Sequence, residues 1–145
     1  STSVHGCSYY GPTEGKPYLE DARPDKESEY QILLGYTGDD NHMPADLTEL
    51  SEKGFDYIAL GYEHKASVMQ SMHMAYAGSL EPLSVQETGK HGFILGEINE
   101  DSTTIRFVPF ACREYINIKV RLSSDITEDE LEEKLTAAIN QYWQR

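Results

Sequence analysis

Two side chains with metal-binding chemistry follow an apolar stretch near the middle of the chain. Residues 55–61 have the pattern of a strand, and Tyr62 and His64 follow it at positions i and i+2. A third candidate, Tyr36, ends another apolar run, residues 30–36. Neutral imidazole is a common ligand for divalent metals, whereas a phenol titrates at about pH 10 and must lose its proton to bind well. His64 is therefore either a candidate metal ligand or, more simply, a hydrogen-bonded histidine at the end of a strand, and we expect the two tyrosines to bind an ion poorly.

Other reactive side chains have weaker patterns around them. His42 lies beside Asp39, Asp40 and Asn41, which indicate either an oxygen-rich cation site or, more simply, a polar loop. No local signature of a cysteine–histidine pair occurs, and no glycine-rich phosphate loop precedes a helix. We predict no catalytic residue within the chain. The basic residues that could bind DNA, or simply face solvent, are Arg106, Arg113, Lys119 and Arg121.

Apolar periodicity predicts an α/β fold. The nearly continuous apolar character of residues 55–61 predicts a strand that is buried on both faces, and the apolar run at residues 30–36 predicts a buried strand. Short links between the later strands favour antiparallel pairing, so we expect a mixed or antiparallel sheet. The segments predicted to be strands are 3–10, 30–36, 55–61, 74–77, 92–98, 104–109 and 115–122.

Two helices are predicted from their terminal residues. A short helix is expected between Pro44 and Gly54, because proline suits the first helical turn and glycine suits the position after the last. A longer C-terminal helix is expected after Thr127, which forms a capping box with Glu130. Residues 11–29 are rich in proline, glycine and charge, which predicts a surface loop.

Composition restricts the class of protein. The chain has 145 residues, a net charge of −13 and only 12 lysines and arginines, which argues against an independent nucleic-acid binder. Two distant cysteines do not make a disulfide framework and favour a reduced, cytoplasmic setting. No apolar run reaches the roughly 18 residues of a membrane span, so no membrane partner is expected.

Several segments together resemble the calcineurin-like metallophosphoesterases, in particular the SbcD-type DNA-repair exonucleases. The most specific match is the strand before Gly61-Tyr62-Glu63-His64-Lys65, which in that family usually ends in Gly-His-x-His-Lys. Tyr62 therefore stands where the family has its first histidine. The other matching segments, which occur in the family's order, are Val4–Tyr9, Ile32–Tyr36, Ala77–Glu81 and Glu87–Gly89.

This resemblance implies the fold and the chemistry. The implied fold is the C-terminal half of a four-layer αββα sandwich, and the implied reaction is phosphodiester hydrolysis by two divalent metals, often manganese. Three family histidines map onto Tyr36, Tyr62 and His64, of which the first two serve the same ion. We therefore expect that ion position to be lost and the chain by itself to bind no metal. The implied partners are DNA and an SbcC-type ATPase.

The resemblance also implies an incomplete catalytic domain. It assigns residues 1–112 to the C-terminal half of that domain, and residues 113–145 to a closing strand and helix that begin the cap region. The family's earlier motifs, Asp-x-His, Gly-Asp-x-x-Asp and Gly-Asn-His-Glu, do not occur in the chain. The chain begins with Ser1 and its first methionine is Met43, so we expect a fragment or degenerate member, inactive by itself.

Two further expectations follow. The alternative to a nuclease fragment is a metal-free paralogue that acts as an assembly or regulatory module. Because half of a layered sandwich exposes an apolar sheet face, we also expect the chain to associate with itself.

Overall fold

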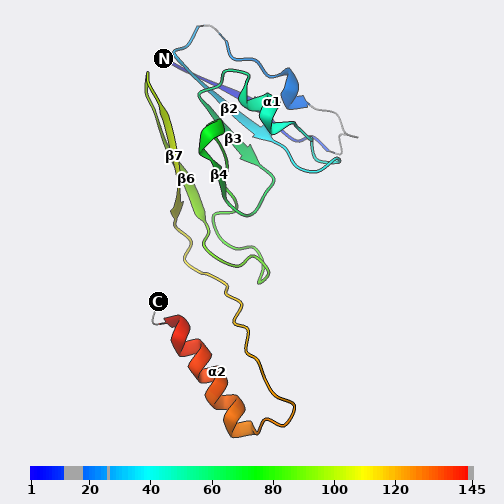
Figure 1. Ribbon diagram of the computed structural model, residues 1–145. Coiled ribbons are helices and arrows are strands. Elements are labelled where there is room, and N and C mark those ends of the chain that lie inside the picture. Colours follow the sequence, from blue (N-terminus) through cyan, green and yellow to red (C-terminus); the bar gives the residue numbers. More distant parts are fainter. Residues whose placement is uncertain (12–17, 26, 144–145) are drawn as a thin grey trace. The chain divides into compact units, whose positions relative to one another are not determined.

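The computed structural model describes residues 1–11, 18–25 and 27–143, and within them a mixed five-stranded sheet forms the main framework (Figure 1). The first four strands in space run parallel, and the fifth pairs antiparallel at the edge. The fold is therefore α/β with a mixed sheet, as predicted. In spatial order the strands are β1 (Thr2–Cys7), β2 (Tyr30–Tyr36), β3 (Tyr57–Gly61), β5 (Met74–Tyr76) and β4 (Ser67–Met69).

The parallel register brings three strand ends together. Cys7 of β1 pairs with Gly35 of β2, and Tyr36 pairs with Gly61 of β3. The strand β2 is connected to β3 through the helix α1 (Leu47–Ser51), a βαβ connection that requires parallel strands. Loops that follow parallel strands meet at the carboxyl edge of the sheet, which is where open α/β sheets bind ligands.

Among the described residues, the main cluster of buried side chains lies on one face of this sheet. Leu33, Ile58 and Leu60 are at most 5% exposed and pack with Leu50 of α1 and Leu19 of the 3₁₀ helix η1 (Tyr18–Asp21). Side chains alternate between the faces of a strand, so their neighbours lie on the other face.

On that second face burial is incomplete. Leu34 is 47% exposed and Val4 59% exposed, while Tyr57 and Ala59 are half-buried. The prediction that β3 is buried on both faces is therefore wrong for Tyr57 and Ala59, and the predicted burial of β2 is wrong for Leu34. The physical reason is that α1 and η1 supply covering side chains to one face only.

The helix α1 is shorter than predicted. It begins after Asp46, whose Oδ1 accepts hydrogen bonds from the backbone N–H groups of Thr48 (2.8 Å) and Glu49 (3.1 Å). The N-cap at Asp46 starts the helix there, so Pro44, which was predicted in the first turn, lies before the helix. Gly54, at φ +87°, lies beyond the end of the helix, as its sequence position predicted.

A β-hairpin packs beside the edge of the sheet. Its strands, β6 (Gly92–Ile98) and β7 (Thr103–Pro109), are antiparallel, as predicted. Gln70, in the 3₁₀ helix η2 (Gln70–Met72), holds the hairpin. Its Nε2 donates to the Thr103 carbonyl (2.7 Å), and its Oε1 accepts from the Ile105 N–H (2.9 Å).

The chain divides into two compact units, Ser1–Tyr115 and Ile116–Arg145. The second contains α2 (Glu128–Trp143), whose predicted capping box is present: Thr127 N–H donates to Glu130 Oε2 (3.0 Å), and Glu130 N–H donates to Thr127 Oγ1 (3.3 Å). No helix among the described residues is long and apolar enough to cross a membrane.

The predicted strand at residues 115–122 is wrong. Its first residue, Tyr115, forms an isolated bridge with Thr88, and no strand follows among the described residues that come after it. Ile118 is 41% exposed and Leu122 is 50% exposed. The apolar pattern is that of a strand, but in the described part of the chain no neighbouring strand pairs with it.

Candidate functional site

Four aromatic side chains meet at the carboxyl ends of the parallel strands. Tyr9 follows β1, Tyr36 ends β2, Tyr62 follows β3, and His42 lies in the loop between β2 and α1. The ring centroids are 5.0 Å apart for Tyr9–Tyr36, 5.7 Å for Tyr36–Tyr62, 5.2 Å for His42–Tyr62 and 5.5 Å for Tyr9–His42. The rings thus form a closed circuit. We call these four rings, together with the Asp39 carboxylate that contacts two of them, the Asp39 cluster.

Asp39 is the hydrogen-bonding centre of this cluster. Its Oδ2 accepts a hydrogen bond from the Tyr62 hydroxyl (2.9 Å), and its Oδ1 interacts with His42 Nδ1 and accepts from the Asn41 N–H (3.0 Å). The loop that presents Asp39 is closed by backbone bonds from Gly38 N–H to the His42 carbonyl and from His42 N–H to the Asp39 carbonyl, both 2.8 Å. Gly-Asp-Asp-Asn is turn-forming chemistry, so this loop is encoded locally.

These contacts shift two pKa values in opposite directions. The hydrogen bonds from His42 and Tyr62 lower the pKa of Asp39 below its ordinary value of 3.8. The hydrogen bond to Asp39 raises the pKa of Tyr62 above its ordinary value of 10.0, and partial desolvation raises it further. At neutral pH the cluster therefore contains an ionised carboxylate and a protonated phenol.

The backbone at Tyr62 is strained. Its φ of +118° lies in a region that L side chains rarely adopt, and a large aromatic residue there is an outlier. The ring lies directly over Gly38, where an added Cβ would come within 2.5 Å of Tyr62 Cγ. The strained conformation is held by specific surroundings, and such strain concentrates at functional positions.

His64 lies outside the Asp39 cluster. Its Nδ1 is 2.8 Å from Glu87 Oε1, and the imidazole is 57% exposed against 20% for the Glu87 side chain. Glu87 Oε2 also accepts from the Leu83 N–H (3.0 Å) and lies 3.3 Å from Ser79 Oγ. The Leu83 N–H and His64 together lower the pKa of Glu87 below its ordinary value of 4.5, so Glu87 is a fixed anion that orients His64.

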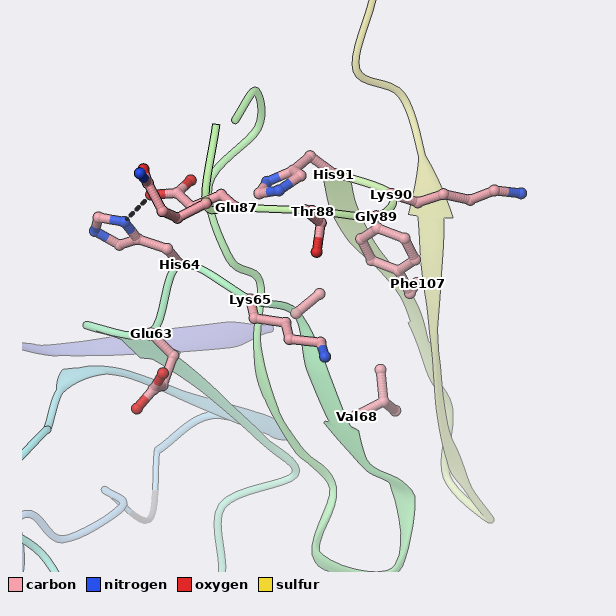
Figure 2. A pocket seen from close by; sticks show the side chains of 12 residues that line it. Glu63, His64, Lys65, Val68, Glu87, Thr88, Gly89, Lys90, His91 and Phe107 are labelled. Atoms are coloured by element: carbon pink, nitrogen blue, oxygen red, sulfur yellow. Dashed lines mark hydrogen bonds and ion pairs between the residues drawn. The ribbon is translucent and has the colours of Figure 1, made fainter. Parts of the chain in front are cut away.

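A pocket of about 570 Å³ opens beside this pair (Figure 2). Consecutive residues diverge at its wall: His64 turns toward Glu87, whereas the Lys65 ammonium group extends toward Val68. The aromatic ring of Phe107 from β7 forms another part of the wall. The pocket therefore combines one inward lysine with an apolar surface.

The predicted metal positions differ in the ligand atoms that they offer. Tyr62 donates a hydrogen bond to Asp39 and packs against neighbouring rings, so its phenol stays protonated and is a poor ligand for an ion. At His64, Glu87 holds Nδ1 and leaves Nε2 for a possible ion, as in many metal-binding histidines. No group of three or more His, Cys, Asp or Glu side chains that could hold a metal lies within residues 1–11, 18–25 and 27–143.

The structure thus brings Tyr36 and Tyr62 into contact and keeps His64 apart from them. The importance of Asp39, Gly38 and Glu87 was missed by the sequence reasoning. For Asp39 a signal existed, because His42 with its acidic neighbours was considered as a polar site. Glu87 pairs with a residue 23 positions away, and only the fold reveals such a contact.

Comparisons with known proteins support the superfamily. The chain is 27% identical over 113 residues to the uncharacterized metallophosphoesterase YhaO of Bacillus subtilis (strain 168). This match covers 72% of the chain and 28% of the relative, so the chain spans less than a third of that protein's length. No family model matches the chain, and no solved structure matches it. The similarity supports a relationship with the metallophosphoesterase superfamily of phosphoester hydrolases, whose members use divalent metals.

Proposed function

We propose that this chain is part of an SbcD-like DNA-repair exonuclease, as a fragment or degenerate member that has lost one of two ion positions. The observation that carries the proposal is the adjacency of the β2 and β3 ends. They place Tyr36 and Tyr62 with ring centroids 5.7 Å apart, and His64 follows two residues later. The similarity to a metallophosphoesterase supports the same reaction class, phosphoester hydrolysis.

The residues of this chain have distinct roles in the proposal. Bound divalent ions would activate water and neutralise charge on the phosphate. His64 would offer Nε2 to one ion, and Glu87 is its positioning residue because it fixes Nδ1 at 2.8 Å. Tyr62 keeps its proton and donates a hydrogen bond to Asp39, so it supplies no ion ligand.

The biological setting is also part of this proposal. The substrate would be DNA and the partner an SbcC-type ATPase. Because the chain carries a net charge of −13, basic residues beyond it would have to supply most phosphate contacts. The free cysteines Cys7 and Cys112 support a cytoplasmic location.

The test uses the complete gene product. Metal content is measured together with manganese-dependent phosphodiesterase activity, for the natural protein and for His64→Asn. We expect the substitution to lower activity by about tenfold or more, because a metal ligand is removed. His73→Asn is the matched control, since it also removes an imidazole and asparagine tolerates the left-handed backbone at φ +48°. Equal activity of His64→Asn and the natural protein would contradict the role given to His64.

A second candidate function is a metal-free assembly or regulatory module. The specific observation in its favour is the pairing of the Tyr62 hydroxyl with Asp39, which leaves that position without a free ligand. A complete gene product that is folded, contains no bound metal and hydrolyses no phosphodiester would select this function over the first.

A further inference from the structure

We infer that the Asp39 cluster is a metal-free clamp, which fills one ion position of the scaffold and ties together the carboxyl ends of β1, β2 and β3. That this place was an ion position rests on the proposed function. The clamp itself rests on contacts among the described residues.

The first argument is connectivity. Tyr9, Tyr36 and Tyr62 come from the ends of three adjacent strands, and His42 comes from the loop after the middle one. Each ring contacts two others in a closed circuit. Aromatic pairs at these separations attract one another beyond simple burial. The circuit therefore joins strand ends that a bound ion would otherwise join through its ligands.

The second argument is space. A divalent ion needs several donor atoms at about 2 Å, and commonly keeps bound water as well. Here the ring centroids are 5.0 to 5.7 Å apart along the circuit, so neighbouring rings touch. In addition, both oxygens of Asp39 are engaged, Oδ1 with His42 and Asn41 and Oδ2 with Tyr62.

The third argument is local adaptation. Tyr62 adopts φ +118°, and Gly38 has no side chain where the Tyr62 ring lies. A Cβ at position 38 would be 2.5 to 2.6 Å from three atoms of that ring. The glycine at position 38 therefore leaves the space that the Tyr62 ring occupies. A metal site that had merely lost its ligands would not require this match.

The experiment uses this 145-residue chain and manganese alone as the probe. Mn²⁺ is paramagnetic and broadens NMR signals near its binding site. With the natural sequence, we expect equimolar Mn²⁺ to leave the amide signals of residues 38–42 intact. Selective broadening of those signals would overturn the inference.

Substitutions within the Asp39 cluster test whether the clamp stabilises the fold. Tyr62→Phe removes the hydroxyl bond to Asp39 and keeps the ring, so the thermal midpoint should fall by roughly 5 °C. Tyr10→Phe is the matched control, because Tyr10 is 94% exposed, and it should change nothing. Gly38→Ala should lower the thermal midpoint further or prevent folding. A Tyr62→Phe midpoint equal to that of the natural sequence would refute the clamp. Absence of phosphodiesterase activity in the complete gene product would contradict the proposed function but not the clamp, so the two proposals can fail separately.

Discussion

Tyr62 and Asp39 depend on each other for their protonation states. A carboxylate that accepts a hydrogen bond from a phenol is easier to ionise, and the phenol is harder to ionise, because both states favour the same bond. Accordingly the pKa of Asp39 is lowered by His42 and Tyr62, and the pKa of Tyr62 is raised by Asp39. At neutral pH the charge of this pair therefore lies on Asp39, and Tyr62 stays neutral.

These opposite shifts predict how stability depends on pH. A lowered pKa means that the contribution of Asp39 is present above its ordinary value of 3.8 and is lost as pH falls through the lowered value. A raised pKa means that the contribution of Tyr62 is present below its ordinary value of 10.0 and is lost as pH rises through the raised value.

The measurement is the urea midpoint of unfolding across the acid and alkaline ranges. We expect Asp39→Asn to lower the urea midpoint most at neutral pH. In this variant the midpoint should also fall less steeply toward acid pH and toward alkaline pH. Glu87, whose pKa is also lowered, retains its own acid contribution in this variant and serves as an internal comparison. If the urea midpoint of Asp39→Asn depends on pH as that of the natural sequence does, the hydrogen bonds of Asp39 do not contribute to stability.

Among the elements, the β6–β7 hairpin shows most clearly how backbone geometry restricts a side chain. Gly92 starts β6, and a Cβ added there would lie 2.0 Å from the Val108 carbonyl oxygen of β7. No real Cβ contact is that short, so the paired strands would have to separate locally. Gly6 in β1 is the opposite case, because nothing lies within 4 Å of its added Cβ.

This contrast gives a matched pair of substitutions. Gly92→Ala should lower the thermal midpoint by roughly 5 °C or more, since it forces backbone apart in an antiparallel pair. Gly6→Ala should change it little. The comparison is made by circular dichroism on the same chain, and equal midpoints for the two variants would contradict the register of β6 against β7.

For the whole molecule, the open face of the main sheet is the dominant feature. Val4 and Leu34 lie on the face that α1 and η1 do not cover, and they are 59% and 47% exposed. Exposed apolar surface of this kind favours association. The net charge of −13 opposes association of two copies, because like charges repel over the Debye length.

We therefore expect self-association that strengthens with salt. Sedimentation velocity at rising protein concentration should show larger species at high ionic strength than at low ionic strength. Leu34→Gln should reduce the fraction of larger species without changing the net charge. Leu83→Gln, at a 68% exposed loop position, should leave that fraction unchanged. A chain that stays monomeric at high concentration and high salt would contradict this expectation.

The sequence by itself determined the features that depend on neighbouring residues. The strand Tyr30–Tyr36, the β6–β7 hairpin and the capping box of α2 were predictable, because apolar periodicity and terminal hydrogen bonds are local properties. The candidate metal positions Tyr36, Tyr62 and His64 came from the family resemblance, and their role stays a prediction. The strand expected at residues 115–122 was wrong, because an apolar pattern does not guarantee a pairing partner.

Tertiary structure decided which of these residues meet. Tyr36 and Tyr62 are in contact because parallel register aligns the ends of β2 and β3. A loop conformation brings Asp39 to Tyr62 and His42, and Glu87 reaches His64 across 23 residues. Burial likewise depended on what covers each face, so Leu33 is buried and its neighbour Leu34 is not. Contacts between distant residues arise from the path of the whole chain, and local patterns do not contain that path.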